Sequence, residues 1–84
     1  MYDICVEKLQ SIYSVTLKLP MHQLTADVNV FSQLGADSLD MLTLAFELEQ
    51  AFGVIIDDGD LEHLYTLSGA MQLLESKRQS LSHE

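Results

Sequence analysis

The chain has 84 residues, of which 48% are hydrophobic, and its 13 acidic and 4 basic side chains give a formal net charge of −9. This length supports one domain but not two, and the negative charge repels nucleic-acid phosphates and anionic membrane surfaces. A single cysteine, Cys5, excludes an internal disulfide, and no leader or long apolar span precedes the domain. We therefore expect a cytoplasmic monomer that binds neither nucleic acid nor membrane.

The first predicted helix covers residues 3–17, and Pro20 marks its end. Its apolar residues share one side of a helical wheel, which is typical of an amphipathic helix that packs on a core. They are Tyr2, Cys5, Val6, Leu9, Ile12, Tyr13 and Leu17. Residues 21–36 contain turn formers and scattered apolar residues without sustained periodicity. This pattern predicts a long loop that is pinned to the core at intervals and has a function.

The second predicted helix covers residues 38–52, and Gly53 supplies its C-terminal stop. Its apolar residues divide into two groups on opposite sides. One group forms a core stripe of Met41, Leu44, Ala45, Leu48 and Phe52, and the other consists of Leu39, Leu42 and Phe46, bordered by Thr43, Glu49 and Gln50. We predict that the second stripe is a protein-docking surface. The alternative is that Val28, Val30 and Phe31 of the preceding loop cover it.

Two further helices complete the predicted fold. An acidic turn leads into a short helix over residues 60–64, and a last helix covers residues 66–78, followed by a frayed tail over residues 79–84. The last helix places Leu67, Ala70, Met71 and Leu74 on one face and Lys77 and Arg78 near its negative end. We therefore predict one all-α domain, a small antiparallel bundle of three main helices and one short helix.

Metal ligation has little support in the sequence. The histidines, His22, His63 and His83, lie far apart and lack the spacing of zinc ligands. The acidic turn of Asp57, Asp58 and Asp60 does not match a calcium-binding EF-hand loop, because Val54 and Ile56 fall at the first and third ligand positions. A looser cation site is the alternative there, but a solvated loop is expected.

Ser38 begins the second helix between Asp37 and Asp40. Aspartate and serine are both preferred N-cap residues, so an ordinary helix start accounts for their spacing. Gly35 and Ala36 leave the approach to Ser38 open, however, and backbone N–H groups at a helix start favour a phosphate. No nucleophile elbow or suitably placed histidine supports catalysis by Ser38, and we expect no enzyme activity.

The run LGADSLD over residues 34–40, with LAFELEQAFGVIID and LYTLSGAMQLLES further along, resembles the acyl carrier proteins over nearly the whole chain. The resemblance implies that 4′-phosphopantetheine is attached to Ser38 by a phosphodiester, with Asp37 as the flanking acid, and that this arm carries acyl groups as thioesters. It implies a phosphopantetheinyl transferase as one partner and acyl-processing enzymes with basic docking patches, such as ketosynthases, acyltransferases or acyl ligases, as others. The implied docking residues are Leu39, Asp40, Leu42, Thr43, Phe46, Glu47 and Glu49.

Two departures from the family pattern leave the pathway open. Thr43 stands where many fatty-acid carriers have a glutamate, and residues 55–57 read Ile-Ile-Asp in place of Ile-Pro-Asp. Fatty-acid, polyketide and specialised acyl-transfer enzymes are therefore all candidate partners. Two alternatives to the carrier function are an acidic adaptor with a carrier-like fold but no phosphopantetheine arm, and a regulatory domain that is switched by phosphorylation of Ser38.

Overall fold

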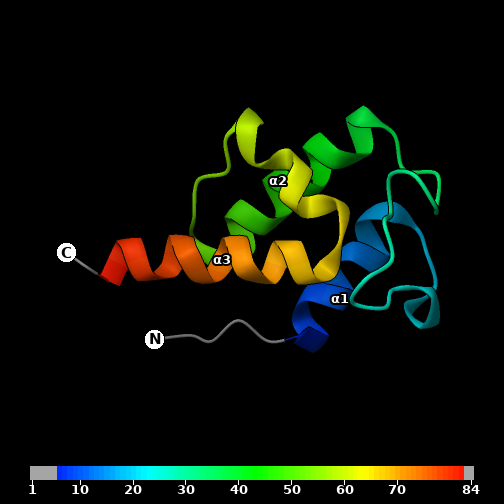
Figure 1. Ribbon diagram of the computed structural model, residues 1–84, viewed down its shortest axis with the longest axis horizontal. Helices are drawn as coiled ribbons and strands as arrows, with labels where there is room; N and C mark the ends of the chain where they lie inside the picture. Colours follow the sequence, from blue (N-terminus) through cyan, green and yellow to red (C-terminus); the bar gives the residue numbers. More distant parts are fainter. Residues whose placement is uncertain (1–5, 83–84) are drawn as a thin grey trace.

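The computed structural model describes residues 6–82, and over this range the chain forms helices and loops without a strand. The three α-helices are α1 (Val6–Leu17), α2 (Ser38–Phe52) and α3 (Leu67–Ser82). Two 3-10 helices lie between them in the chain, η1 (Met21–Gln23) after α1 and η2 (Asp58–Tyr65) after α2. In Figure 1, α2 and α3 both run from right to left, so the segment that contains η2 carries the chain back across the fold. The predicted all-α class is confirmed, but α2 and α3 run in the same direction and so are not the antiparallel pair that was predicted.

The hydrophobic core is shared by the three α-helices, η2 and the loop between α1 and α2. All five residues of the predicted core stripe of α2 are buried. On α3 the buried set is Leu67, Ala70, Leu73 and Leu74, and Met71 is partly buried against it. Helical periodicity therefore identifies the buried face of α2, whereas on α3 it misses Leu73, which is buried beside the predicted residues.

α1 ends at Leu17 through a left-handed turn at Lys18, which has φ of 59°. The Leu19 N–H donates to the Ser14 carbonyl oxygen at 3.1 Å, which closes the last turn of the helix. Of the expected apolar face, Leu9 and Tyr13 are fully buried, whereas Val6 is half exposed because it lies beside an open cleft. Tyr2, Cys5 and the predicted helix start at residue 3 lie outside the described residues.

The loop between α1 and α2 is fastened to the segment around η2 and the start of α3. The Val30 N–H donates to the Tyr65 carbonyl oxygen at 2.8 Å, and the Ser68 N–H donates to the Ala26 carbonyl oxygen at 3.1 Å. The Phe31 ring stacks on the Tyr65 ring, with 4.8 Å between the ring centroids. These contacts confirm a loop that is pinned at intervals, although η1 within it was not predicted.

The C-terminal elements are longer than the sequence predicts. The predicted helix over residues 60–64 is a 3-10 helix that begins at Asp58 and ends at Tyr65. α3 starts one residue late because the Thr66 hydroxyl oxygen accepts the Gly69 N–H at 3.0 Å, which places Thr66 just before the helix. α3 continues to Ser82, so the tail predicted to fray from residue 79 is helical up to that point, where no proline or glycine interrupts it.

Candidate functional site

Asp37 and Asp40 start α2 as a reciprocal capping pair. The Asp40 N–H donates to Asp37 Oδ1 at 2.8 Å, and the Asp37 N–H donates to Asp40 Oδ2 at 3.1 Å. Asp37 is the N-cap, and Ser38 is the first residue inside the helix. If Ser38 were the cap, Met41 would occupy the third helical position and could not return the hydrogen bond. The two aspartates therefore form the helix start without the Ser38 hydroxyl.

The Ser38 side chain is exposed, and its hydroxyl forms no hydrogen bond with the part of the chain whose side chains the structure describes, residues 6–77. The backbone N–H groups of Ser38 and Leu39 also lack an acceptor in this part of the chain, as expected in the first turn of a helix. Such N–H groups carry the positive end of the helix dipole and favour a phosphate oxygen. Ser38 is thus a free hydroxyl at a position that suits a phosphoryl group.

Gly35 and Ala36 shape the approach to Ser38 in different ways. Gly35 has φ of +84°, and a Cβ atom added there would meet no other atom within 4 Å. Ala36 is buried, and its N–H donates to the Val30 carbonyl oxygen at 3.0 Å. The prediction of an open approach therefore holds at Gly35 but is wrong at Ala36, which anchors the loop because its methyl group packs into the core.

The second apolar stripe of α2 faces outward. Leu39, Leu42 and Phe46 are 71%, 49% and 54% exposed. The alternative that the loop covers this stripe is wrong, because Val30 is buried in the core and Phe31 stacks on Tyr65. Asn29 Oδ1 accepts the N–H groups of Phe31 and Ser32, so this part of the loop folds into a turn of its own.

The polar residues predicted for docking differ in how free their side chains are. The Thr43 hydroxyl donates to the Leu39 carbonyl oxygen at 3.0 Å, and Asp40 belongs to the capping pair. Glu49 is half-buried, and its Oε2 accepts the Ile56 N–H at 2.7 Å. Glu47 is exposed, with no hydrogen bond or ion pair to any described residue. Among the described residues, Glu47 is therefore the one acid predicted for docking on α2 whose carboxylate is free.

The acidic turn at the start of η2 is a structural element. Asp60 Oδ2 accepts the Asp57 N–H at 3.1 Å and forms an ion pair with Lys77 Nζ at 2.8 Å. The hydrogen bond and charge of Lys77, together with the Asp57 N–H, lower the pKa of the Asp60 carboxyl below its usual 3.8. Lys77 therefore ties α3 to η2, and it does not lie at the end of α3 as predicted.

Metal and membrane features are absent from residues 6–82. No group of three or more His, Cys, Asp or Glu side chains in this range could hold a metal ion. His22 and His63 are exposed, and His83 lies outside the described residues. No helix in the same range is long and apolar enough to cross a membrane.

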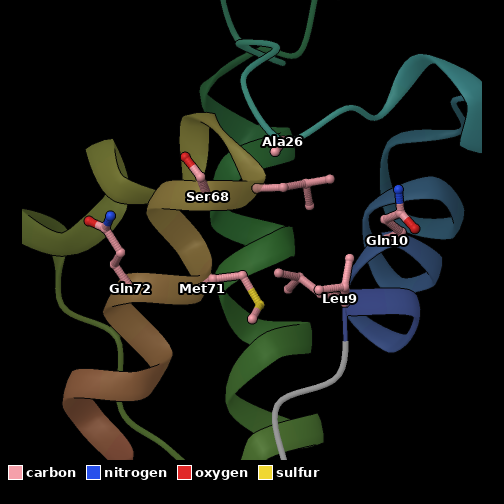
Figure 2. A pocket seen from close by; sticks show the side chains of 8 residues that line it. Leu9, Gln10, Ala26, Ser68, Met71 and Gln72 are labelled. Atoms are coloured by element: carbon pink, nitrogen blue, oxygen red, sulfur yellow. The ribbon is translucent and has the colours of Figure 1, made fainter.

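An apolar cleft of about 330 Å³ lies between α1, α3 and the loop that joins α1 to α2. Figure 2 shows the Leu9 and Met71 side chains pointing toward each other across it. The remaining lining residues are Val6, Gln10, Ala26, Leu67, Ser68 and Gln72. None of the site residues predicted from the sequence lines this cleft. Sequence patterns did not indicate it, because three segments that are distant in the sequence form its walls.

Comparisons with known proteins point to one family. A family model described as a phosphopantetheine attachment site matches residues 7–74. The chain is 39% identical over 70 residues to the acyl carrier protein of Thermotoga maritima, covering 83% of this chain and 86% of that protein. It is 38% identical over 71 residues to the acyl carrier protein of Guillardia theta, covering 84% and 88%. A solved structure of the acyl carrier protein from Enterococcus faecalis matches with a TM-score of 0.70 and 28% identity, covering 88% of this chain and 99% of that chain.

Proposed function

We propose that Ser38 holds the phosphopantetheine arm of this chain, which belongs to the acyl carrier protein family. The function is that of a carrier, in which the terminal thiol of the arm holds acyl groups as thioesters. The observation that supports Ser38 is its free hydroxyl: Asp37 and Asp40 cap α2, so Ser38 is exposed and unpaired within the described residues. Modification of this hydroxyl breaks no contact of the helix start.

The surroundings of Ser38 fit a phosphodiester. The unpaired N–H groups of Ser38 and Leu39 can donate to its oxygens, and Gly35 leaves open space in the preceding turn. The two neighbouring carboxylates oppose a further negative charge, but Asp37 and Asp40 each already accept a backbone N–H. The local field therefore tolerates a phosphodiester at this position.

In this proposal a phosphopantetheinyl transferase attaches the arm, and acyl-processing enzymes then dock on α2. The exposed stripe of Leu39, Leu42 and Phe46 supplies the apolar contact, and the net charge of −9 steers partners with basic patches. The tethered arm raises the local concentration of the acyl group for each docked enzyme. The chain forms a single domain over residues 1–84, acts as a cytoplasmic monomer, and supplies no catalytic group of its own.

The test is to coexpress the chain with a broad-specificity phosphopantetheinyl transferase and to measure its intact mass. We expect one added phosphopantetheine on the parent protein, none on Ser38→Ala, and an unchanged adduct on Ser32→Ala, which alters another exposed serine. An unmodified parent protein, or an adduct that survives Ser38→Ala, would refute the proposal. Addition of a phosphate group alone would instead support the regulatory alternative.

A further inference from the structure

Phe31 and Tyr65 bring two aromatic rings together at the edge of the core, and we call them the aromatic pair. The rings are stacked, with 4.8 Å between their centroids and 11° between their planes. Tyr65 is partly buried against the core, whereas Phe31 is 36% exposed. Tyr65 therefore backs the Phe31 ring from the core side, and part of the Phe31 ring stays open to solvent.

The turn that carries Phe31 is held by its own hydrogen bonds and has no charge. Asn29 Oδ1 accepts the N–H groups of Phe31 and Ser32 at 2.9 Å and 2.8 Å, and the Asn29 N–H donates to Gln33 Oε1 at 2.8 Å. Residues 28–36 include no acidic or basic side chain. An uncharged ring can therefore approach Phe31 without desolvating a charge in this turn, and the turn is already ordered when it arrives.

Two backbone hydrogen bonds connect the aromatic pair to the start of α2. The Val30 N–H donates to the Tyr65 carbonyl oxygen at 2.8 Å, and the Val30 carbonyl oxygen accepts the Ala36 N–H at 3.0 Å. Phe31 follows Val30 in the chain, and Ala36 is two residues before Ser38. Standard backbone dimensions along this path put the Cα atoms of Phe31 and Ser38 at most about 18 Å apart.

A phosphopantetheine arm on Ser38 is long enough to bring its acyl group to the aromatic pair. About sixteen bonds separate the serine oxygen from the first acyl carbon beyond the thioester carbonyl, and they span about 19 Å at about 1.2 Å per bond. The arm also keeps its acyl group at an effective concentration in the millimolar range. An affinity of about 1 mM for the aromatic pair would therefore keep about half of the acyl groups bound.

We propose that the aromatic pair binds a planar aromatic acyl group on the arm, so that aromatic acyl thioesters are the cargo class that this chain favours. This inference rests on the proposed function of Ser38. Aromatic rings prefer offset stacks with centroids about 4.5–7 Å apart, and the open part of the Phe31 ring accepts another ring in this arrangement. An alkyl chain has no ring to stack there, so it gains less from this surface.

The test loads isotope-labelled protein with an unlabelled benzoyl arm from benzoyl coenzyme A, by means of a broad-specificity phosphopantetheinyl transferase. Intact mass checks that loading is complete. In NMR spectra, the benzoyl ring protons should show NOE contacts to the Phe31 ring protons and an upfield shift relative to the free thioester, because they lie over an aromatic ring. The matched ligand is the cyclohexanecarbonyl group, a ring of similar size without π electrons, which should show neither effect.

Three variants assign the effect to Phe31. Phe31→Leu keeps an apolar side chain but removes the ring, and it should lose the upfield shift, whereas Phe31→Tyr keeps the ring and should keep the shift. Phe46→Leu is the matched control, because Phe46 is another partly exposed phenylalanine, and its benzoyl shift should equal that of the parent protein. Circular dichroism checks that each variant keeps the helix content of the parent protein.

The outcomes separate this inference from the proposed function. If the parent protein is never loaded, the proposed function fails, and this inference fails with it. If the parent protein is loaded but the benzoyl protons show no NOE contact to Phe31, the inference alone fails. Equal contacts from the benzoyl and cyclohexanecarbonyl groups would make the pair a general apolar surface and refute the preference for aromatic cargo. An upfield shift that survives Phe31→Leu, or that Phe46→Leu abolishes, would place the cargo elsewhere and also refute the inference.

Discussion

Replacing Tyr13 with phenylalanine removes a buried hydrogen bond between α1 and η2. Tyr13 is fully buried, and its hydroxyl donates to the Leu64 carbonyl oxygen at 2.6 Å. Phenylalanine keeps the ring and its packing but leaves this carbonyl oxygen unpaired in the core, which costs about 1–3 kcal/mol. For a domain of this size, 1 kcal/mol corresponds to about 4–8 °C in Tm. We therefore expect Tm to fall by about 4–24 °C.

The assay is thermal and urea unfolding followed by circular dichroism. Tyr65→Phe is the matched control, because the Tyr65 hydroxyl has no hydrogen bond within the described residues and phenylalanine keeps the stack on Phe31. The free energy of unfolding of this control should lie within about 0.5 kcal/mol of the parent value. Equal stabilities for Tyr13→Phe and Tyr65→Phe would refute the assignment of this hydrogen bond as a stabilising link.

The same substitution has a consequence at alkaline pH. Burial raises the pKa of the Tyr13 hydroxyl far above its usual 10.0, so the folded protein holds this proton more tightly than the unfolded chain does. The resulting stabilisation is complete at pH values below the pKa that Tyr13 has in the unfolded chain. It is lost progressively as the pH rises from there toward the higher pKa that Tyr13 has in the folded protein. Tyr13→Phe should therefore lose less stability than the parent protein above about pH 10. Parallel stability curves for the two proteins would contradict this reasoning.

Three further substitutions test the packing around η2, the ion pair and the docking face. Gly69→Ala should lower the free energy of unfolding, measured by urea unfolding, by about 1–3 kcal/mol, because the added Cβ would lie 2.4 Å from the His63 carbonyl oxygen. Gly59→Ala is the control and should not destabilise the protein, because a Cβ at Gly59 would meet no other atom within 4 Å. Lys77→Met removes the ion pair that lowers the pKa of Asp60. In urea unfolding at a series of pH values, the parent protein should exceed the variant in stability most above about pH 4, and this difference should disappear as the pH falls through the pKa of Asp60 in the folded protein. Phe46→Asp should leave Tm within a few degrees of the parent value, because Phe46 is 54% exposed. The variant should raise the KM that a phosphopantetheinyl transferase has for this protein as its substrate. Loss of folding would instead assign Phe46 to the core.

The α2 region could be predicted closely because its signals are local. Leucine, methionine, alanine and glutamate favour a helix, the spacing of Asp37 and Asp40 allows the capping pair, and Gly53 takes the left-handed conformation that ends it. Helical geometry then separates the buried stripe from the exposed one. The short helix was less predictable, because the contacts that hold the end of η2 come from distant segments: the Tyr13 hydroxyl donates to the Leu64 carbonyl oxygen, and the Val30 N–H donates to the Tyr65 carbonyl oxygen.

From the sequence alone follow the helical class, a serine at a helix start and a second apolar stripe on the same helix, because each depends on residues within a few turns of one another. Only the tertiary structure decided that Phe31 stacks on Tyr65 and leaves this stripe uncovered, and that Asp60 pairs with Lys77. It also decided that Glu49 binds the Ile56 N–H and so is not a freely available docking acid. These contacts join segments that the chain brings together only on folding, and the pattern of a single helix contains no signal for them.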